Sequence, residues 1–249
     1  MDNTQRFSGL AELYAQARPA YAGELIDFLY SRQFSADSRI ADIGSGTGKF
    51  ARLLLDRGST VYCVEPNSDM RAQAVRELSE YAGFRSVDGE ASRTALEDAS
   101  VDFVTAAQAF HWFDVPAFRR ECQRILKPCG SVFLIWNVRA DSGVNRAWQE
   151  LLSAYCPDFK GFSAGLQKDD PRIGAFFVRG YAYKAFDNPL RYSREAFVKR
   201  CLSSSYSLRA DNPAYGAYLA ALEALFDRYA EKDALTVPNQ SVVYFGAPA

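Results

Sequence analysis

Histidine and methionine are scarce in this chain of 249 residues, which has one His and two Met. Its five cysteines share no CxxC spacing and stand at positions 63, 122, 129, 156 and 201. A single histidine and scattered cysteines argue against a transition-metal site, so we expect no bound metal. The cysteines are expected to be reduced thiols, as in a cytoplasm.

An excess of charge of one sign is also missing. The chain has 29 Lys and Arg against 30 Asp and Glu, for a formal net charge of -1. The basic side chains are scattered, which argues against a nucleic-acid partner. No signal-peptide core opens the sequence and no apolar run approaches the length of a membrane span. We therefore expect a cytoplasmic protein with one good core, free of membrane partners, as a monomer or homodimer.

Three glycines stand at alternate positions in the segment Asp42-Ile-Gly-Ser-Gly-Thr-Gly-Lys49. An apolar stretch at 39–41 precedes it, and a helical pattern at 50–55 follows it. Alternate glycines let the chain turn sharply out of a strand and bring bare backbone against a ligand. The next helix then directs its N-terminal N–H groups at that ligand. The segment predicts a nucleotide-cofactor loop.

Two phosphate-binding alternatives fit this loop less well. A dinucleotide fingerprint needs a third glycine three residues beyond Gly46, where Lys49 stands. A Walker loop needs glycine at Ile43 and a hydroxyl at Phe50. An NAD-dependent oxidoreductase is therefore an alternative whose cofactor loop requires a third glycine that this sequence lacks.

A second strand and its acidic end follow at the spacing of a βαβ unit. Residues 60–64 are β-branched and apolar, as in a strand buried on both faces. Glu65 ends this strand, and a carboxylate about twenty residues beyond the glycines can accept hydrogen bonds from a ribose diol. Pro66 breaks the strand, and Asn67 or Ser68 can cap a helix over 70–81.

These segments resemble motifs of the class I S-adenosylmethionine-dependent methyltransferases over residues 39–137. Further matches are the strands expected at 84–87, 100–107 and 131–136 and the turn Leu126-Lys-Pro-Cys-Gly130. In the family, the acidic residue matching Glu65 holds the ribose, and Glu90 and Ala91 match residues at the adenine; Ser92 departs from an acid often found there. The resemblance implies S-adenosylmethionine as cofactor, bound by Asp42, Gly44, Gly46, Gly48, Glu65, Pro66, Glu90, Ala91, Ala107 and Gln108.

The resemblance also implies a fold. We expect an α/β, Rossmann-like, seven-stranded, mostly parallel sheet with helices on both faces, closed by strands at 181–186 and 241–245 with the last antiparallel. Helices are expected at 194–203 and 214–229. The chain should form a single domain over 1–249, made of an N-terminal lid (1–38), a cofactor core (39–137), a lid insertion (138–180) and closing strands and helices (181–249).

Two segments point to an acceptor site. Phe110-His-Trp-Phe113 and the opening Tyr14-Ala-Gln-Ala-Arg-Pro-Ala-Tyr21 resemble the trans-aconitate methyltransferase branch, which esterifies carboxylates. A small-molecule acceptor would then lie between His111, Arg18, Tyr14 and Tyr21, near Trp136.

The role of each acceptor-site residue has alternatives. Arg18 could hold a carboxylate of the substrate or of the cofactor, or be an ordinary surface arginine. His111 would orient a carboxylate, act as base for a hydroxyl or amine acceptor, or simply cap a helix. A protein that binds the cofactor without transferring its methyl group is the alternative of another class.

Overall fold

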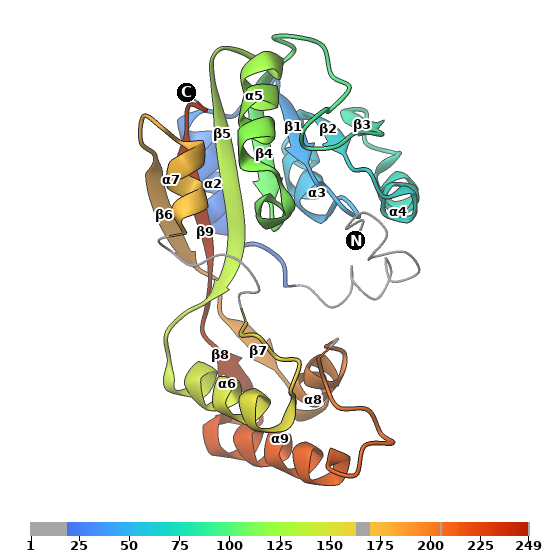
Figure 1. Cartoon of the computed structure of the whole chain (residues 1–249), viewed down its shortest axis with the longest axis vertical. Coiled ribbons are helices and arrows are strands. Elements are labelled where there is room, and N and C mark those ends of the chain that lie inside the picture. Colours follow the sequence, from blue (N-terminus) through green and yellow to red (C-terminus); the bar gives the residue numbers. More distant parts are fainter. Residues whose placement is uncertain (1–18, 163–169, 205, 249) are drawn as a thin grey trace. The chain divides into compact units, whose positions relative to one another are not determined.

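The computed structural model describes residues 19–162, 170–204 and 206–248 (Figure 1). Within these residues the chain divides into two compact units. Unit 1 contains 19–136, 170–186 and 241–248, and unit 2 contains 137–162, 187–204 and 206–240. No helix of the described residues is long and apolar enough to cross a membrane.

Unit 1 is built on a seven-stranded sheet in the order β3-β2-β1-β4-β5-β9-β6 (Figure 1). The strands are β1 (Arg39–Ile43), β2 (Thr60–Val64), β3 (Phe84–Val87), β4 (Val101–Ala107), β5 (Leu126–Arg139), β6 (Ala182–Asp187) and β9 (Asn239–Gly246). The first five strands pair in parallel, and β9, the last along the chain, is antiparallel. The predicted Rossmann-like sheet is confirmed. Its chain order reverses beside β1, so the carboxyl ends of β1 and β4 meet at a switch point.

Helices cover this sheet because successive strand residues point to opposite faces. Unit 1 has α2 (Gly23–Arg32), α3 (Lys49–Leu55), α4 (Ser68–Leu78), η2 (Phe110–Trp112), α5 (Val115–Ile125) and α7 (Pro171–Phe176). Leu29 of α2 and Leu54 of α3 share one apolar cluster with Ile135. The next residue, Trp136, points to the other face and packs on Phe110, whose ring also contacts α5 and α7.

Helix starts follow the polar residues of the sequence. Asn67 caps α4 because its side-chain oxygen accepts from the backbone N–H groups of Asp69 and Met70, at 3.1 and 3.0 Å. Asp114 caps α5 in the same way by accepting from Ala117 N–H at 2.8 Å.

The Leu126-Lys-Pro-Cys-Gly130 segment differs from the simple turn that we expected. Helix α5 already ends at Ile125, and residues 127–130 form an irregularity in β5 opposite Asp102. The left-handed φ of 70° belongs to Cys129. Gly130 is needed for space, because a Cβ there would lie 2.9 Å from the Asp102 carbonyl oxygen.

Unit 2 has a core of its own. It contains α6 (Gly143–Tyr155), α8 (Arg194–Leu202) and α9 (Tyr215–Tyr229) and the antiparallel pair β7 (Leu190–Tyr192) and β8 (Leu235–Val237). Trp148, Phe197, Tyr218 and Leu222 are fully buried in it. The helices expected at 194–203 and 214–229 are α8 and α9. The grouping of 137–162 with 187–240 cuts across the expected boundary at 180/181, and a lid role for 138–180 stays a prediction.

Candidate functional site

The glycine loop joins β1 to α3, and its three glycines meet different demands. All three have left-handed backbone, with φ of 67°, 57° and 80° at Gly44, Gly46 and Gly48. A Cβ at Gly44 would lie 2.7 Å from the Ala109 Cβ, and one at Gly48 would lie 2.4 Å from a methyl of Leu78. A Cβ at Gly46 would meet nothing within 4 Å. Packing therefore requires Gly44 and Gly48, whereas Gly46 presents backbone to open space.

Glu65 follows β2 beside this loop. Its Oε2 accepts a hydrogen bond from Gly46 N–H and its Oε1 accepts one from Asn67 N–H, each at 3.0 Å. Burial raises the pKa of the Glu65 carboxyl, and these two N–H groups and Arg71 offset part of that rise. A carboxylate has about four lone-pair sites, so both oxygens can accept a further bond from a ligand.

Asp42 lies beneath the loop in β1 and is 1% exposed. Its Oδ1 accepts from the Thr105 hydroxyl of β4 at 2.7 Å. Its Oδ2 is buried and has no hydrogen-bond partner among the described residues. Burial raises the pKa of Asp42 to about 7; the bond from Thr105 lowers it, and the nearby Glu65 carboxylate raises it. Its Oδ2 oxygen, unpartnered among the described residues, is therefore a buried acceptor directly beneath the glycine loop.

The expected adenine residues lie in the loop after β3. Glu90 is exposed and exchanges backbone hydrogen bonds of 3.0 Å with Arg93, while Ala91 is partly buried. Gly89 lies against the end of β2, because a Cβ there would come within 3.0 Å of Val64. The two residues are thus in a tight turn next to the strand that ends in Glu65.

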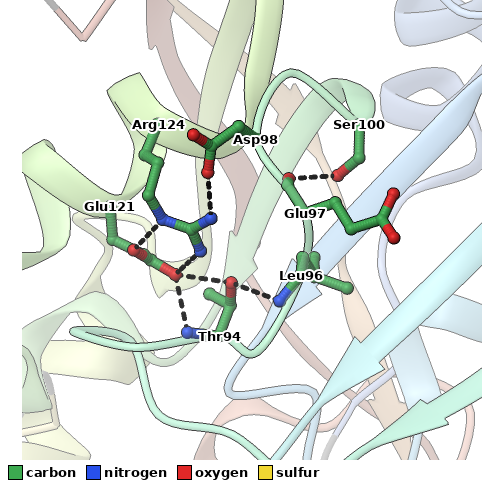
Figure 2. Close-up of polar contacts among 7 residues, drawn as sticks. All are labelled: Thr94, Leu96, Glu97, Asp98, Ser100, Glu121 and Arg124. Atoms are coloured by element: carbon green, nitrogen blue, oxygen red, sulfur yellow. Dashed lines mark hydrogen bonds and ion pairs between the residues drawn. The ribbon is translucent and has the colours of Figure 1, made fainter.

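A polar network ties the far side of this loop to α5 (Figure 2). The Glu121 Oε1 accepts from the Thr94 N–H at 2.7 Å and from the Thr94 hydroxyl at 2.6 Å. Arg124 donates to both oxygens of Glu121, at 2.7 and 2.9 Å, and to Asp98 at 2.6 Å. The sequence gives no local sign of the contacts of Glu121 with Thr94 and of Arg124 with Asp98, because these partners lie 27 and 26 residues apart.

The end of β4 leads directly into the segment that carries His111. Gln108 has a left-handed φ of 57°, and its N–H donates to the Ile135 carbonyl at 2.8 Å. His111 is partly buried in η2, and its ring lies 4.8 Å from the ring of Trp112, which is 41% exposed. Ala107, at the last position of β4, is partly buried against the core.

Arg172 adds a cation beside His111 that the sequence analysis missed. Its Nη1 donates to the His111 carbonyl at 3.4 Å, and its Nε and Nη2 bind the two oxygens of Asp170 at 2.9 and 2.7 Å. Asp170 also caps α7, so the Asp-Pro pair at 170–171 was the available signal. The charge of Arg172 is already compensated by this forked pair.

The remaining expected residues are placed only in part. Tyr14 and Arg18 lie outside the described residues. Tyr21 packs edge-on against Phe50, with ring centroids 5.0 Å apart. Trp136 is 3% exposed and packs between Phe110 and Tyr244. Pro66 follows Glu65 and is partly buried.

The glycine loop and a carboxylate at the neighbouring strand end lie on a sheet of the kind found in methyltransferase structures. Residues 41–134 match the family described as a methyltransferase domain. An uncharacterized methyltransferase of Mycobacterium tuberculosis is 36% identical over 138 residues, which are 55% of this chain and 54% of that protein. The chain thus spans about half the length of the curated relatives that it matches.

Solved structures share the fold. One named as a methyltransferase from an antibiotic biosynthesis pathway of Anabaena variabilis aligns with a TM-score of 0.62 at 21% identity, over 88% of this chain and 96% of that one. Geranyl diphosphate C-methyltransferase of Streptomyces coelicolor, solved with S-adenosyl-L-homocysteine, aligns with a TM-score of 0.50 at 15% identity, over 91% of this chain and 79% of that one. At these identities the likeness establishes the fold.

Proposed function

We propose that this protein transfers a methyl group from S-adenosylmethionine to a small organic acceptor. The observation that carries the proposal is the pairing of Gly46 with Glu65. The loop presents its open backbone face at Gly46, and the Glu65 carboxylate lies 3.0 Å from the same N–H group. A nucleoside can bind where open backbone and a carboxylate that accepts hydrogen bonds from hydroxyl groups lie at adjoining strand ends.

The residues present fit this cofactor. Glu65 would accept hydrogen bonds from the two ribose hydroxyls, since its oxygens keep lone pairs beyond those used by Gly46 and Asn67. Asp42 Oδ2 would receive a polar or cationic part of the ligand. The turn at Glu90 and Ala91 would bind the adenine. When bound, the cofactor supplies an electrophilic methyl group on a sulfonium centre.

For the acceptor we propose a carboxylate. Such a group is already a nucleophile, so the chain has to align it and exclude water, which can account for about 7–11 kcal/mol of a barrier. His111 would orient the carboxylate, with Tyr14, Arg18 and Tyr21 as the other contacts. For a hydroxyl or amine acceptor, His111 would instead remove a proton.

The test is titration calorimetry with S-adenosylhomocysteine. Glu65→Ala removes charge-assisted hydrogen bonds worth about 1.5–3 kcal/mol each, so affinity should fall at least tenfold. Glu77→Ala, on the exposed side of α4, is the control and should bind like the wild type. Unchanged affinity in Glu65→Ala would contradict the assignment.

Transfer itself needs a second measurement. Purified protein with labelled S-adenosylmethionine should label at least one member of a panel of small carboxylic acids, phenols and amines. Binding without any transfer would favour the alternative of a cofactor-binding protein that does not methylate.

A further inference from the structure

Arg139 is a cation that packs against two aromatic rings of unit 2. Its guanidinium carbon lies 4.0 Å from the ring centroid of Trp148 and 4.4 Å from that of Phe162. The two rings lie only 5.1 Å from each other, so they contact the guanidinium from adjoining sides, and its N–H groups still need polar partners. The side chain is partly buried, so some of it is accessible from solvent.

Within the described residues this cation has no carboxylate partner. Its one hydrogen bond is a long contact of 3.4 Å from Nη1 to the Asn145 side-chain oxygen. The ion pairs of the described residues involve other cations, such as Arg146 with Asp141 or Arg194 with Asp227. A guanidinium has five N–H groups, so Arg139 retains donors for a ligand.

The surroundings of Arg139 make the lack of a carboxylate partner more costly. Burial lowers its pKa to about 10, and the charge of Arg200 lowers it as well, while Tyr192, Tyr206 and Cys201 raise it. Two neighbouring cations without an anion repel each other, and a buried charge needs compensation. The Tyr192 and Tyr206 side chains are partly buried hydroxyl donors near the same group.

We propose that unit 2 binds a small organic carboxylate, held by the edge of the Arg139 guanidinium and assisted by the charge of Arg200. A planar fork of donors matches a carboxylate in a bidentate arrangement. Asn145, whose oxygen faces Arg139 Nη1, is itself fixed, because its amide donates to the carbonyls of Ala140 and Pro238, at 2.8 and 2.7 Å. None of its residues is among those that we assign to the cofactor, so this proposal and the proposed function can fail separately.

Calorimetric titration of the full chain with acetate, succinate, citrate, benzoate and inorganic phosphate tests the proposal. At least one carboxylate should bind saturably at one site, and phosphate should bind about tenfold more weakly. Arg139→Met keeps aliphatic packing against the rings and should weaken the binding of that carboxylate at least about tenfold. Arg146→Met, on the exposed side of α6, is the matched control and should leave the affinity unchanged.

Three results would overturn the proposal: no carboxylate binds the wild type, phosphate alone binds, or Arg139→Met binds as well as the wild type. If Arg139→Met does not fold, the arginine Nε–H signals of the wild type decide. Saturating carboxylate should shift the Arg139 signal, assigned with Arg139→Lys, and an unshifted signal would refute the site.

Discussion

Gly44 and Gly46 are two residues apart, yet their substitution should have different effects. Both need a left-handed backbone, which costs an alanine about 1–2 kcal/mol. At Gly44 the added methyl also lies 2.7 Å from the Ala109 Cβ, which cannot rotate away. Gly44→Ala should therefore lose more than about 2 kcal/mol of unfolding free energy in urea titrations.

Gly46→Ala should instead retain most of its stability and lose cofactor affinity, because its methyl points into the open space that we assign to the ligand. Calorimetry on the two folded variants would show this. Equal stability losses at both positions, with cofactor affinity intact in Gly46→Ala, would contradict the assignment of that space.

Asp42 should make stability depend on pH. Burial raises its pKa to about 7, above the 3.8 of an exposed aspartate, so the folded protein holds this proton more tightly than the unfolded chain does. The contribution of this bound proton to the free energy of unfolding is therefore full below about pH 4 and is lost as the pH rises toward 7. Asp42→Asn cannot ionise at this position. Its free energy of unfolding should therefore rise relative to that of the wild type by about 1–4 kcal/mol between pH 4 and pH 8.

Urea unfolding of both proteins at several pH values measures this difference. A constant difference in unfolding free energy from pH 4 to pH 8 would show that Asp42 titrates normally. Comparing the two proteins at each pH cancels the contributions of the other carboxylates.

Among the elements, α5 supports the loop after β3 through Glu121. Burial raises the pKa of this carboxyl, but hydrogen bonds from Arg124 and Thr94 outweigh burial and lower it overall. Glu121→Ala leaves the Thr94 N–H without its acceptor, so the turn at Glu90 and Ala91 should loosen. We expect a loss of about 1–3 kcal/mol in stability and a several-fold weaker affinity for S-adenosylhomocysteine.

Asp102 offers a matched control at the opposite ends of the strands. Its carboxylate accepts from Arg39 N–H at 2.8 Å and Lys127 Nζ at 2.7 Å, which joins the starts of β1 and β5 to β4. Asp102→Ala should lower stability by a similar amount and leave cofactor affinity unchanged. If both variants bind the cofactor like the wild type, α5 does not support the cofactor loop.

Local pattern was enough to predict much of unit 1. The alternate glycines, the β-branched strand at 60–64 and the Asn67 cap each specify their structure within a few residues, and the topology of the sheet followed from the family resemblance. The α6 helix could have been predicted as well, since Val144, Trp148 and Leu152 recur every four residues along its buried face.

Long-range contacts could not be predicted in this way. Glu121 meets Thr94, and Arg139 meets Phe162, only because the chain folds back over more than twenty residues. A charge on its own gives no local sign of its partner. The sequence pointed to Arg18, which lies outside the described residues and stays a prediction. Arg139, which we propose as an anion-binding residue of unit 2, is not distinguished by its flanking sequence.

At the scale of the whole molecule, two units with separate cores lead us to propose two separate ligand sites. Hydrogen exchange measured by mass spectrometry can locate both. S-adenosylhomocysteine should slow exchange in unit 1 at the segments that hold it, 44–48, 65–70 and 88–94. A bound carboxylate should slow exchange in unit 2, near Arg139 and over α6 and α8, because a ligand that binds only the folded state suppresses its local opening.

Two variants make this comparison decisive. Glu65→Ala should abolish the first pattern of protection and keep the second, and Arg139→Met should do the reverse. If the carboxylate protects only the segments of unit 1, it binds at the end of β4 beside His111, and the site at Arg139 is wrong. If S-adenosylhomocysteine protects neither 44–48 nor 65–70, the nucleoside site is wrong, because burying the Gly46 face and occupying the Glu65 carboxylate must restrict the opening of these two backbone segments.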